Sequence, residues 1–389
     1  ARDGEEVSKL VVDIARRHGV TKAAKSKSML SEEARLNEAL SAAGIRPVET
    51  DLGEYIVQLA GEPPSHIIAP AVHKTIGEVE ALFAKEHGRP LETRTSADIP
   101  EMAKEARAVL RQHFLSAEMG ISGANFLIAE TGSAALVTNE GNGRMVTTLP
   151  KVHVVITGIE KIVEKLDHVP PLLSLLTRSA TGQNISTYFN MISGPRKADE
   201  KDGPTEVHLV LLDNGRTQAY ADEQLRKTLQ CIRCGACMNH CPVYTRIGGH
   251  AYGTTYPGPI GKIISPHLLG LEATANMASA SSMCGACGEV CPVKIPIPEL
   301  LMRLREESYS APHANPAMRG QGAGYSRLIT SVWRGWAAVY RSPALYGVVT
   351  WLGSRFGRLM PSRQGAWTSV RVPLRPAPKR LRDMLKERG

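Results

Sequence analysis

All seven cysteines of this chain of 389 residues lie between positions 231 and 291, and they form two groups. The first group reads Cys231-Ile-Arg-Cys234-Gly-Ala-Cys237-Met-Asn-His-Cys241-Pro. The second group reads Cys284-Gly-Ala-Cys287-Gly-Glu-Val-Cys291-Pro. The first group has the spacing of bacterial ferredoxins, and the second repeats its last three cysteines with Ser281 at the remaining position. The sequence therefore predicts iron–sulfur clusters and a role in handling electrons.

The spacing also predicts which cysteines share a cluster. In two-cluster ferredoxins, the last cysteine of each run ligates the other cluster. Carried over by position, one 4Fe-4S cluster is expected on Cys231, Cys234, Cys237 and Cys291. The second cluster is expected on Cys241, Cys284 and Cys287, with Ser281 at its fourth position. With three thiolates, this second cluster is predicted to be either a 4Fe-4S or a 3Fe-4S form.

Two other uses of the cysteines fit the spacing less well. Cys-x2-Cys pairs also bind zinc, and a four-thiolate zinc site with three spare thiols would use all seven. Zinc does not require two Cys-Pro endings or repeated two-residue gaps, so iron–sulfur ligation is the better interpretation. Disulfides are disfavoured because the chain has no cysteine outside the two groups and has the features of a cytosolic protein.

Positive charge is concentrated in the last section of the chain. Residues 301–389 hold 16 Lys and Arg against 4 Asp and Glu, whereas the whole chain has a net charge of +9. The four tryptophans of the chain also lie here, at Trp333, Trp336, Trp351 and Trp367. Such a basic helical tail suits docking on a partner subunit or on a membrane surface. Binding to nucleic acid is not expected, because the tail has no recognisable reader fold.

The remaining composition points to a multidomain cytoplasmic protein. The chain has no run of 18 or more apolar residues and no visible signal peptide. We therefore expect a cytoplasmic location, and the basic tail leaves open a peripheral position at the inner face of the membrane.

The first 210 residues or so alternate helices with short apolar runs, which predicts an α/β domain with a largely parallel sheet. Strands are predicted over 67–72, 126–130, 134–138, 152–157 and 207–212. Helices are predicted over 5–19, ending at Gly19, and after the capping-box patterns that begin at Thr75 and Asp98. Residues 139–143 are predicted to form a hairpin turn or a ligand loop. A helix over 222–230 leads to the cysteines, and one over 299–307 closes the cluster domain.

Four further stretches carry a family resemblance. They read Lys25-Ser-Lys-Ser-Met-Leu30, Glu49-Thr-Asp-Leu-Gly-Glu-Tyr-Ile-Val-Gln-Leu59, Ala129-Glu-Thr-Gly132 and Tyr256-Pro-Gly-Pro-Ile-Gly261. Together with the cysteine runs, they resemble the lactate utilization protein B family, iron–sulfur proteins of bacterial L-lactate oxidation, over almost the whole chain. The resemblance implies a LUD domain, related in fold to CoA-transferase and sugar-phosphate isomerase domains, followed by an α-helical ferredoxin domain.

Three segments of the chain are therefore expected. They are a LUD-like α/β domain over 1–212, a ferredoxin domain with two clusters over 213–308, and a linker with the basic tail over 309–389. The linker itself is expected over 309–326. Because the family normally has residues ahead of the position of Ala1, we expect the beginning of the LUD domain to be missing.

The resemblance also implies electron transport in a complex with the companion lactate utilization proteins A and C. Oxidation of L-lactate to pyruvate releases two electrons, and two adjacent one-electron clusters suit their relay one at a time. We find no convincing flavin or nicotinamide fingerprint, so a non-catalytic electron-transfer subunit is expected. Two alternatives are a hydroxy-acid dehydratase that uses an open iron of the three-cysteine cluster as a Lewis acid, and a redox-sensing regulator.

The α/β domain offers weaker candidates. Glu130 follows a predicted strand, as the nucleophile of CoA-transferase-like folds does, but capping of a nearby turn is the favoured interpretation. Lys25, Lys27 and Ser28 are suited to bind a carboxylate or phosphate together with Arg144. A solvated loop explains these four residues nearly as well.

Three histidines complete the candidates. His73 and His153 have apolar neighbours in the sequence and are expected to be structural. His240 lies inside the first cysteine run, and we expect it to tune a cluster through a hydrogen bond rather than to ligate iron.

Overall fold

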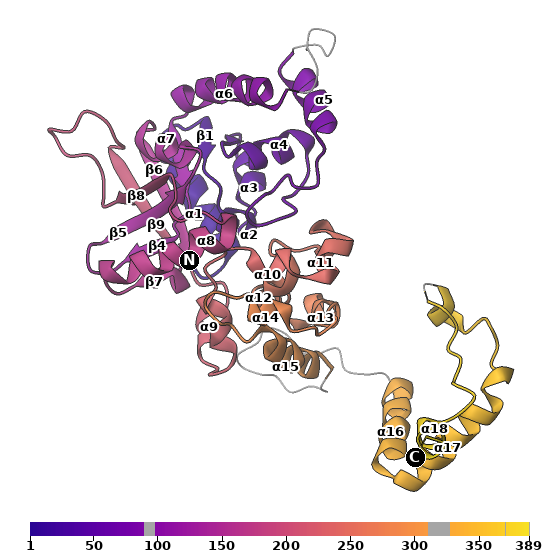
Figure 1. Cartoon of the computed structure of the whole chain (residues 1–389). Helices are drawn as coiled ribbons and strands as arrows, with labels where there is room; N and C mark the ends of the chain where they lie inside the picture. Colours follow the sequence, from indigo (N-terminus) through magenta and orange to yellow (C-terminus); the bar gives the residue numbers. More distant parts are fainter. Residues whose placement is uncertain (89–97, 310–326, 370, 389) are drawn as a thin grey trace. The chain divides into compact units, whose positions relative to one another are not determined.

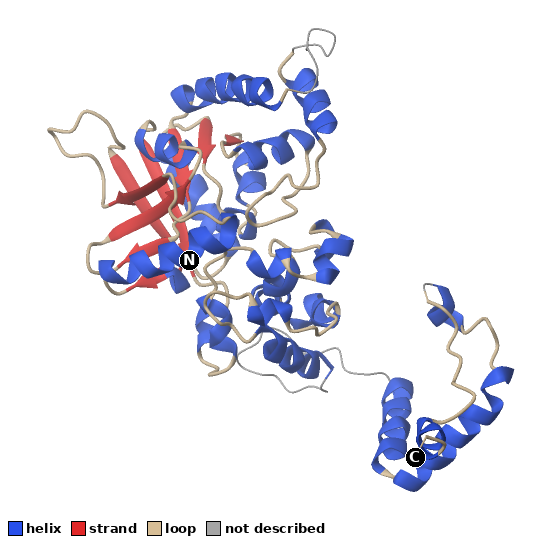
Figure 2. Cartoon of the chain, in the orientation of Figure 1, coloured by secondary structure: helices blue, strands red, loops and turns tan. Residues whose placement is uncertain are grey.

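The computed structural model describes residues 1–88, 98–309, 327–369 and 371–388. The chain divides into two compact units, Ala1–Ala323 and Gly324–Gly389, and each is described by itself (Figure 1). Strands gather in the section of the first unit that ends at Leu212 (Figure 2). The described residues that follow, up to Tyr309, form helices and loops. The first unit therefore has an α/β half and a helical half.

A five-stranded parallel sheet forms the centre of the α/β half. Its strands, in spatial order, are β2 (Arg46–Glu49), β1 (Lys22–Lys25), β3 (Met119–Ser122), β6 (Val152–Gly158) and β9 (Glu206–Leu212). All four neighbouring pairs run parallel. All seven residues of β6 are buried, as expected for a strand covered on both faces. The largely parallel sheet of the prediction is thus present.

Three helices pack against this sheet and complete its main core. They are α1 (Gly4–Arg17), α2 (Met29–Glu33) and α3 (Leu36–Ala42). Helix α1 presents Val7, Val11 and Ile14 at helical spacing, and these residues pack with Met119 of β3. The predicted helix over 5–19 is confirmed, and Gly19 follows its C-cap with a left-handed φ of +61°.

A second apolar core surrounds Val48 of β2 and the buried ring of Phe83. The helices that build it are α4 (Leu52–Ala60), α5 (Ile76–Glu86) and α6 (Ile99–Ser116). The predicted capping box forms at Thr75, whose side chain and that of Glu78 each bond the other's backbone. At the start of α6 the predicted box is wrong, because no side-chain cap bond is made by Asp98.

A smaller mixed sheet lies in the same half and was not predicted as a separate sheet. Its strands, in order, are β7 (Ile162–Val163), β4 (Phe126–Ile128), β5 (Ser133–Thr138) and β8 (Tyr188–Ile192). Strand β5 is antiparallel to both β4 and β8, whereas β4 and β7 are parallel. Helix α8 (Val169–Thr181) packs on this sheet through the buried Val169. The strand predictions near 126–138 are thus confirmed, with boundaries shifted by up to two residues.

One prediction for local structure is wrong, and for a second segment one of the two predicted alternatives is wrong. Residues 67–72 form an irregular loop and not a strand, because Ile67 and Ile68 pack on the helical half instead of entering a sheet. Residues 139–143 do not form a hairpin turn. They lead from β5 into helix α7 (Asn142–Thr148), so the second apolar run seen in the sequence belongs to a helix.

The helical half is built around two long helices. Helices α12 (Gly258–Leu269) and α15 (Ile297–Tyr309) pack through Ile260, Ile264 and Leu304, among other buried residues. The shorter elements are α9 (Arg216–Tyr220), η4 (Leu225–Gln230), α10 (Ala236–Asn239), α11 (Pro242–Ile247), η5 (His250–Tyr252), α13 (Leu271–Ser279) and α14 (Ala286–Glu289). The predicted helix over 222–230 is therefore a shorter 3-10 helix, and the one over 299–307 is confirmed within α15.

The second unit contains the basic tail. Its elements are α16 (Arg327–Arg341), α17 (Pro343–Phe356), η6 (Gly357–Leu359), η7 (Gly365–Ser369) and α18 (Leu381–Lys386). Trp336 stacks on Tyr340 with ring centroids 4.2 Å apart, yet 52% of Trp336 is exposed. The predicted linker beyond residue 309 and the side chain of Trp367 lie outside the described residues. Within the described ranges, no helix has the length and apolar character needed to cross a bilayer.

Candidate functional site

The two cysteine groups fold into loops of the same shape. In the first loop Arg233 and Gly235 adopt left-handed φ angles of +64° and +77°, and α10 begins immediately afterwards. In the second loop Met283 and Gly285 do the same, with φ of +57° and +85°, and α14 follows. These reversals on either side of the central cysteine curl the backbone around its thiol. The sequence repeat is therefore also a structural repeat.

The match extends to Ser281, which stands where the first loop has Cys231. The Cys231 Sγ accepts a hydrogen bond from the backbone N–H of Arg233 at 3.4 Å. The Ser281 Oγ accepts the corresponding bond from the N–H of Met283 at 3.2 Å. The serine hydroxyl thus points in the direction that a thiol takes in the other loop.

The structure brings the cysteines together around two separate cavities. The first cavity is lined by Cys231, Cys234, Cys237 and Cys291. The second is lined by Cys241, Cys284 and Cys287, and by Ser281. These are the two groupings that the crossed pattern predicts. Cys291 lines the first cavity although it lies 54 residues after Cys237 in the sequence.

The thiols fit a metal cluster better than they fit isolated cysteines. Burial raises the pKa of Cys234, Cys237 and Cys287, so without a metal these thiols favour the neutral form. Iron supplies the positive charge that stabilises buried thiolates, and backbone N–H groups that point at sulfur add to it. Such an N–H bond reaches Cys291 from Ile295 at 3.3 Å. The donor set in both cavities is therefore of the type that holds iron–sulfur clusters.

The two cavities differ in exposure. In the first, Cys234, Cys237 and Cys291 are all buried. In the second, Cys284 is exposed, and the N–H of Ala286 lowers the pKa of its thiol. The one exposed thiol among the seven thus belongs to the site with three cysteines, whereas Cys231 of the first site is partly buried.

A buried lysine accompanies the second cavity. Lys262 of α12 is 1% exposed, lines the cavity and donates a hydrogen bond to the carbonyl of Ala280 at 2.5 Å. Burial lowers the pKa of Lys262, and the thiols of Cys241 and Cys287 oppose this effect. An ammonium group in this place is positioned to offset negative charge on the thiolates.

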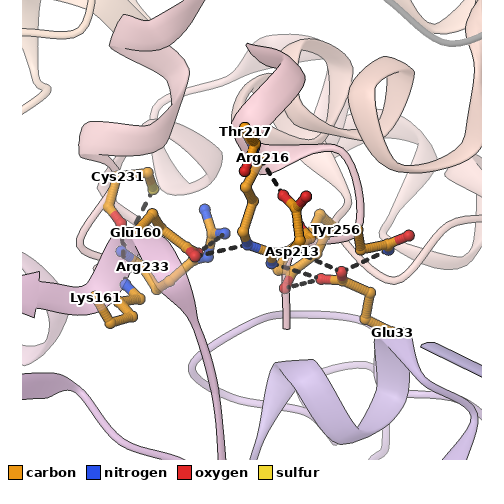
Figure 3. Close-up of polar contacts among 10 residues, drawn as sticks. Glu33, Glu160, Lys161, Asp213, Arg216, Thr217, Cys231, Arg233 and Tyr256 are labelled. Carbon is orange, nitrogen blue, oxygen red and sulfur yellow. Dashed lines mark hydrogen bonds and ion pairs between the residues drawn. The ribbon is translucent and has the colours of Figure 1, made fainter. Parts of the chain in front are cut away.

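Two partly buried cations also lie beside the first cavity (Figure 3). Lys161, in η2 (Ile159–Lys161), donates to the backbone carbonyl of Cys231 at 3.1 Å. Burial lowers the pKa of Lys161 to about 8, and the charge of Arg233 adds to this effect. The guanidinium of Arg233 lies 4.6 Å from the centre of the Tyr256 ring and 3.4 Å from Glu160.

A chain of ion pairs continues from Arg233 into the α/β half (Figure 3). Glu160 also pairs with Arg216 at 2.6 Å, and Arg216 binds both carboxylate oxygens of Glu33 at 2.9 and 3.0 Å. The Tyr256 hydroxyl donates to Glu33 at 2.9 Å. Arg216 is fully buried, so these bonds are the compensation for its desolvation. The network ties α2 and η2 of the α/β half to α9 and the first cysteine loop.

A second contact joins the halves through the loop that was mistaken for a strand. His66 bonds Asn239 at 3.1 Å, and the Tyr244 hydroxyl donates to the carbonyl of Ser65 at 2.7 Å. Gly249 is required here, since a Cβ atom at this position would lie 1.7 Å from the Ser65 carbonyl oxygen. The cysteine loops are therefore held against the α/β half on two sides.

Comparisons with known proteins agree with this arrangement. The LUD domain family matches residues 1–212, the 4Fe-4S dicluster domain matches 227–295, and the family described as lactate utilisation protein B, C-terminal, matches 303–389. Lactate utilization protein B of Bacillus licheniformis is 43% identical over 397 residues, which cover all of this chain and 80% of that protein. The chain belongs to the lactate utilization protein B family.

Two more relatives of this chain are informative. Lactate utilization protein B of Bacillus subtilis is 42% identical over 395 residues, covering all of this chain and 80% of that protein. The uncharacterized electron transport protein YkgF of Escherichia coli is 48% identical over 306 residues, covering 78% of this chain and 63% of that protein. These names agree with an electron-transfer protein and do not favour a dehydratase or a regulator.

The structure also shows where the weaker candidate residues of the α/β half lie. Lys25 does not join a ligand cradle, because it is fully buried and pairs with Glu49 at 2.5 Å. Lys27 and Ser28 line a larger cavity, whereas Arg144 is exposed on α7 and does not line it. Glu130 is exposed and accepts a hydrogen bond from the N–H of Leu166 at 2.9 Å, which is a capping role.

The histidines are placed as follows. His153 is fully buried, bonds the Ser122 hydroxyl at 2.8 Å, and has its pKa lowered to about 4 by burial. His73 lies between the Ser65 hydroxyl and Glu62, at 2.7 and 2.8 Å. These contacts are structural, as expected. His240 lines the second cysteine cavity and bonds the carbonyl of Ala236 at 3.0 Å.

Sequence reasoning missed the buried cations. Lys262 carries a readable signal, because it stands alone in the otherwise uncharged stretch Tyr256-Pro-Gly-Pro-Ile-Gly-Lys-Ile-Ile-Ser-Pro266. Lys161 and Arg216 carry none, because each lies in an ordinary polar segment and bonds to residues distant in sequence.

Proposed function

We propose that this chain is an electron-transfer subunit of a bacterial complex that oxidises L-lactate to pyruvate. The observation that carries the proposal is the pair of cysteine-lined cavities, one with four thiols and one with three thiols and Ser281. The family's name supplies the pathway, and the name of the relative from Escherichia coli supplies electron transport.

The ligand assignment follows the two cavities. Cys231, Cys234, Cys237 and Cys291 would hold a 4Fe-4S cluster. Cys241, Cys284 and Cys287 would hold a 4Fe-4S or 3Fe-4S cluster, with Ser281 at the fourth position. Each cluster, when bound, accepts and donates one electron at a time.

The surrounding residues prepare the sites for that exchange. Lys161 and Arg233 beside the first set, and Lys262 beside the second, offset the negative charge of the thiolates and of an added electron. Burial of Cys234, Cys237 and Cys291 limits the contact of the first set with water. The ion pairs from Arg233 through Glu160 to Arg216 hold the first loop at a fixed position against the α/β half.

Removal of hydrogen from L-lactate releases two electrons together, so the complex requires a two-electron organic acceptor on another subunit. We assign that step to the companion proteins A and C. The chain is then divided into a LUD domain (1–212), a ferredoxin domain that carries the clusters (213–308) and a tail (309–389). The exposed Trp/Arg-rich tail would dock on a partner or on the inner face of the membrane, with the rest of the chain in the cytoplasm.

The test is reduction of the clusters by lactate in the purified complex. The complex is prepared without oxygen, and absorbance and electron paramagnetic resonance are recorded after L-lactate is added. We expect both clusters to be reduced, and Cys234→Ala to abolish delivery of electrons to a dye. Cys234→Ala has a matched control in Ser279→Ala, a small change on α13. Unchanged dye reduction by the Cys234→Ala complex would contradict the proposed relay.

A further inference from the structure

Two histidines and a glutamate meet at the edge of the parallel sheet, outside the linings of the two cysteine cavities. Glu206 and His208 belong to β9, the last strand of the sheet. His18 is the C-cap residue of α1, which packs on the same sheet. One ring nitrogen of each histidine and one carboxylate oxygen of Glu206 lie within 4.8 Å of one another. Three side chains that commonly bind metals thus converge from two elements distant in sequence.

The alternation of β9 explains why its two residues meet His18. Every second residue of a strand points to the same face, so Glu206 and His208 share a face with Val210 and Leu212. Val210 and Leu212 belong to the apolar core that the buried residues of α1 complete (Figure 1). Helix α1 therefore covers this face, and its C-terminal end brings His18 to Glu206 and His208.

The spacing of the ligand atoms matches the coordination of zinc. His18 Nε2 lies 3.2 Å from Glu206 Oε2, and His208 Nε2 lies 3.5 Å from the same oxygen. In a tetrahedral zinc site with bonds of about 2.0–2.1 Å, two ligand atoms lie about 3.3 Å apart. Both observed separations are within about 0.2 Å of that value. A zinc ion therefore fits among the three atoms with only small adjustments of the side chains.

One of these nitrogens has no partner in the protein. The Nε2 atom of His208 is buried and makes no hydrogen bond with any residue that the structure describes. Its separation of 3.5 Å from Glu206 is too long for such a bond. A buried polar atom that the protein does not satisfy is expected to contact an ordered water or an ion. The nitrogen of a neutral imidazole is also the commonest metal ligand in proteins.

The surroundings favour a cation. Glu206 supplies a negative charge, and His18 stands at the C-terminal end of α1, where a helix carries partial negative charge. Arg16 and Arg17 of the last turn are exposed, so solvent screens their opposing charge. The side chain of Glu206 is 51% exposed, which gives an ion a route from solvent.

A second cluster of the same composition is already satisfied by the protein. It consists of Glu62, His73 and His250. A hydroxyl and a carboxylate bond the two ring nitrogens of His73, and His250 Nε2 bonds the carbonyl of Pro63 at 2.8 Å. The ammonium of Lys74 also pairs with Glu62. A metal ion would have to displace these partners, so this cluster serves as an internal comparison.

We propose that His18, Glu206 and His208 bind one Zn²⁺ ion, with the fourth coordination position open to water. Two imidazole nitrogens and a carboxylate form a known set of zinc ligands. Mg²⁺ and Ca²⁺ prefer ligand sets made of oxygen. The ion would join the end of α1 to the last strand of the sheet. This site is separate from the clusters and does not depend on the function proposed for them.

The experiment uses the full chain with its clusters loaded, prepared without oxygen in metal-free buffer at neutral pH. Isothermal titration with Zn²⁺ is expected to give one bound ion per chain, and a large excess of Mg²⁺ or Ca²⁺ should not compete. X-ray absorption at the zinc edge then identifies the ligands. We expect nitrogen and oxygen neighbours at about 2.0–2.1 Å, whereas zinc bound by the cysteines would show sulfur at about 2.3 Å. Iron content and visible spectra confirm that the clusters stay in place.

Three variants with matched controls locate the ion. His18→Ala, His208→Ala and Glu206→Gln should each weaken zinc binding by at least about tenfold, because even the loss of a residue that only supports a metal ligand costs this much. The controls are His168→Ala, an exposed histidine ahead of α8, and His250→Ala, from the satisfied cluster. Both should leave zinc binding unchanged.

The outcomes decide the proposal without reference to the relay. No binding of Zn²⁺ by cluster-loaded protein, or sulfur neighbours around the bound ion, would overturn it. Binding that neither His18→Ala nor His208→Ala weakens would overturn it as well, and so would binding that only His250→Ala removes. The relay is tested by cluster reduction in the complex, so a failed zinc titration leaves it standing.

Discussion

Ser281 and Cys231 occupy equivalent positions in two loops of the same shape. Each accepts a hydrogen bond from the backbone N–H two residues later, at 3.2 Å for the serine and 3.4 Å for the cysteine. In both loops the residue that donates this bond has a left-handed backbone. The difference between the two candidate cluster sites at this position is thus confined to one atom, oxygen in place of sulfur.

This equivalence predicts the effect of Ser281→Cys. A hydroxyl binds iron poorly unless it is deprotonated, so the second cluster should be a three-iron form or a four-iron form with one labile corner. A thiol at position 281 is already aimed correctly and should complete the set. We expect the two clusters to become more alike in their electron paramagnetic resonance, and the second to survive exposure to air for longer.

The control is Ser282→Cys, which adds a thiol one residue out of register in the same loop. It should not stabilise the second cluster. Equal protection by both variants, or none by Ser281→Cys, would contradict the assignment of position 281.

The proposed crossed ligand sets give a second prediction. Cys291 belongs to the second sequence group but lines the first cavity, with Cys231, Cys234 and Cys237. Cys291→Ala should therefore damage the four-thiolate cluster, and Cys241→Ala should damage the other one. Iron content and resonance spectra of the two variants measure this. If Cys291→Ala spared the signal that Cys234→Ala removes, the crossed assignment would be wrong.

The sequence was most informative where the cysteines lie close together in the chain. The two-residue gaps and the Cys-Pro endings predict the conformation of each cysteine loop. The crossed ligation of two-cluster ferredoxins then predicts which cysteines line the same cavity. The long buried strand β6 was readable for a related reason, since seven consecutive buried residues leave an apolar run. Strands β1 and β2 were missed because they have four residues each and include Lys22, Lys25, Arg46 and Glu49 at their ends.

The buried charge of Arg216 was beyond a reading of the sequence. Arg216 pairs with Glu33, 183 residues earlier, and no local pattern marks either residue. The apolar stretch at Ile67 and Ile68 was misread for the same reason. These two side chains are apolar because they pack on the helical half, which is distant in sequence and becomes their neighbour only in the folded chain.

A third prediction concerns the pH dependence of stability. Glu54 of α4 is 3% exposed, and burial together with Glu49 and Glu32 raises its pKa from 4.5 to about 8. Between these two pH values the folded chain holds a proton that the unfolded chain releases. The stabilisation from this group is therefore complete below pH 4.5 and is lost as the pH rises through 8.

Glu54→Gln removes this dependence, because glutamine stays neutral. We expect the variant to melt higher than the parent protein at pH 8.5, by about 2 °C or more, with a smaller gap at pH 5.5. Thermal scans at a fixed rate on cluster-loaded protein measure the gap, and the exposed Glu5→Gln is the control. A gap that narrows as the pH rises would show that Glu54 is not the group responsible.

The tail gives a fourth prediction. Trp333, Trp336 and Trp351 are about half exposed, at 51%, 52% and 48%, so they leave apolar surface for a partner. A chain that ends at residue 323 should keep both clusters but lose affinity for proteins A and C or for anionic vesicles. Equal co-purification and equal flotation of the truncated and full chains would leave the tail without either role.

The cations beside the two cysteine cavities give a fifth prediction. A cation near a cluster favours the reduced state, which carries one more negative charge, so removing it should lower the reduction potential. Arg233→Met should lower the potential of the first cluster, and Lys262→Met that of the second, each by on the order of 50 mV. Redox titration monitored by electron paramagnetic resonance resolves the two signals.

Each variant serves as the control for the other. Arg233 lies in the loop between Cys231 and Cys234, whereas Lys262 lines the cavity of Cys241 and Cys287. A structural disturbance of the helical half would move both potentials together or cause loss of iron. A charge effect moves only the nearer cluster, and a shift of both signals in either variant would argue against it.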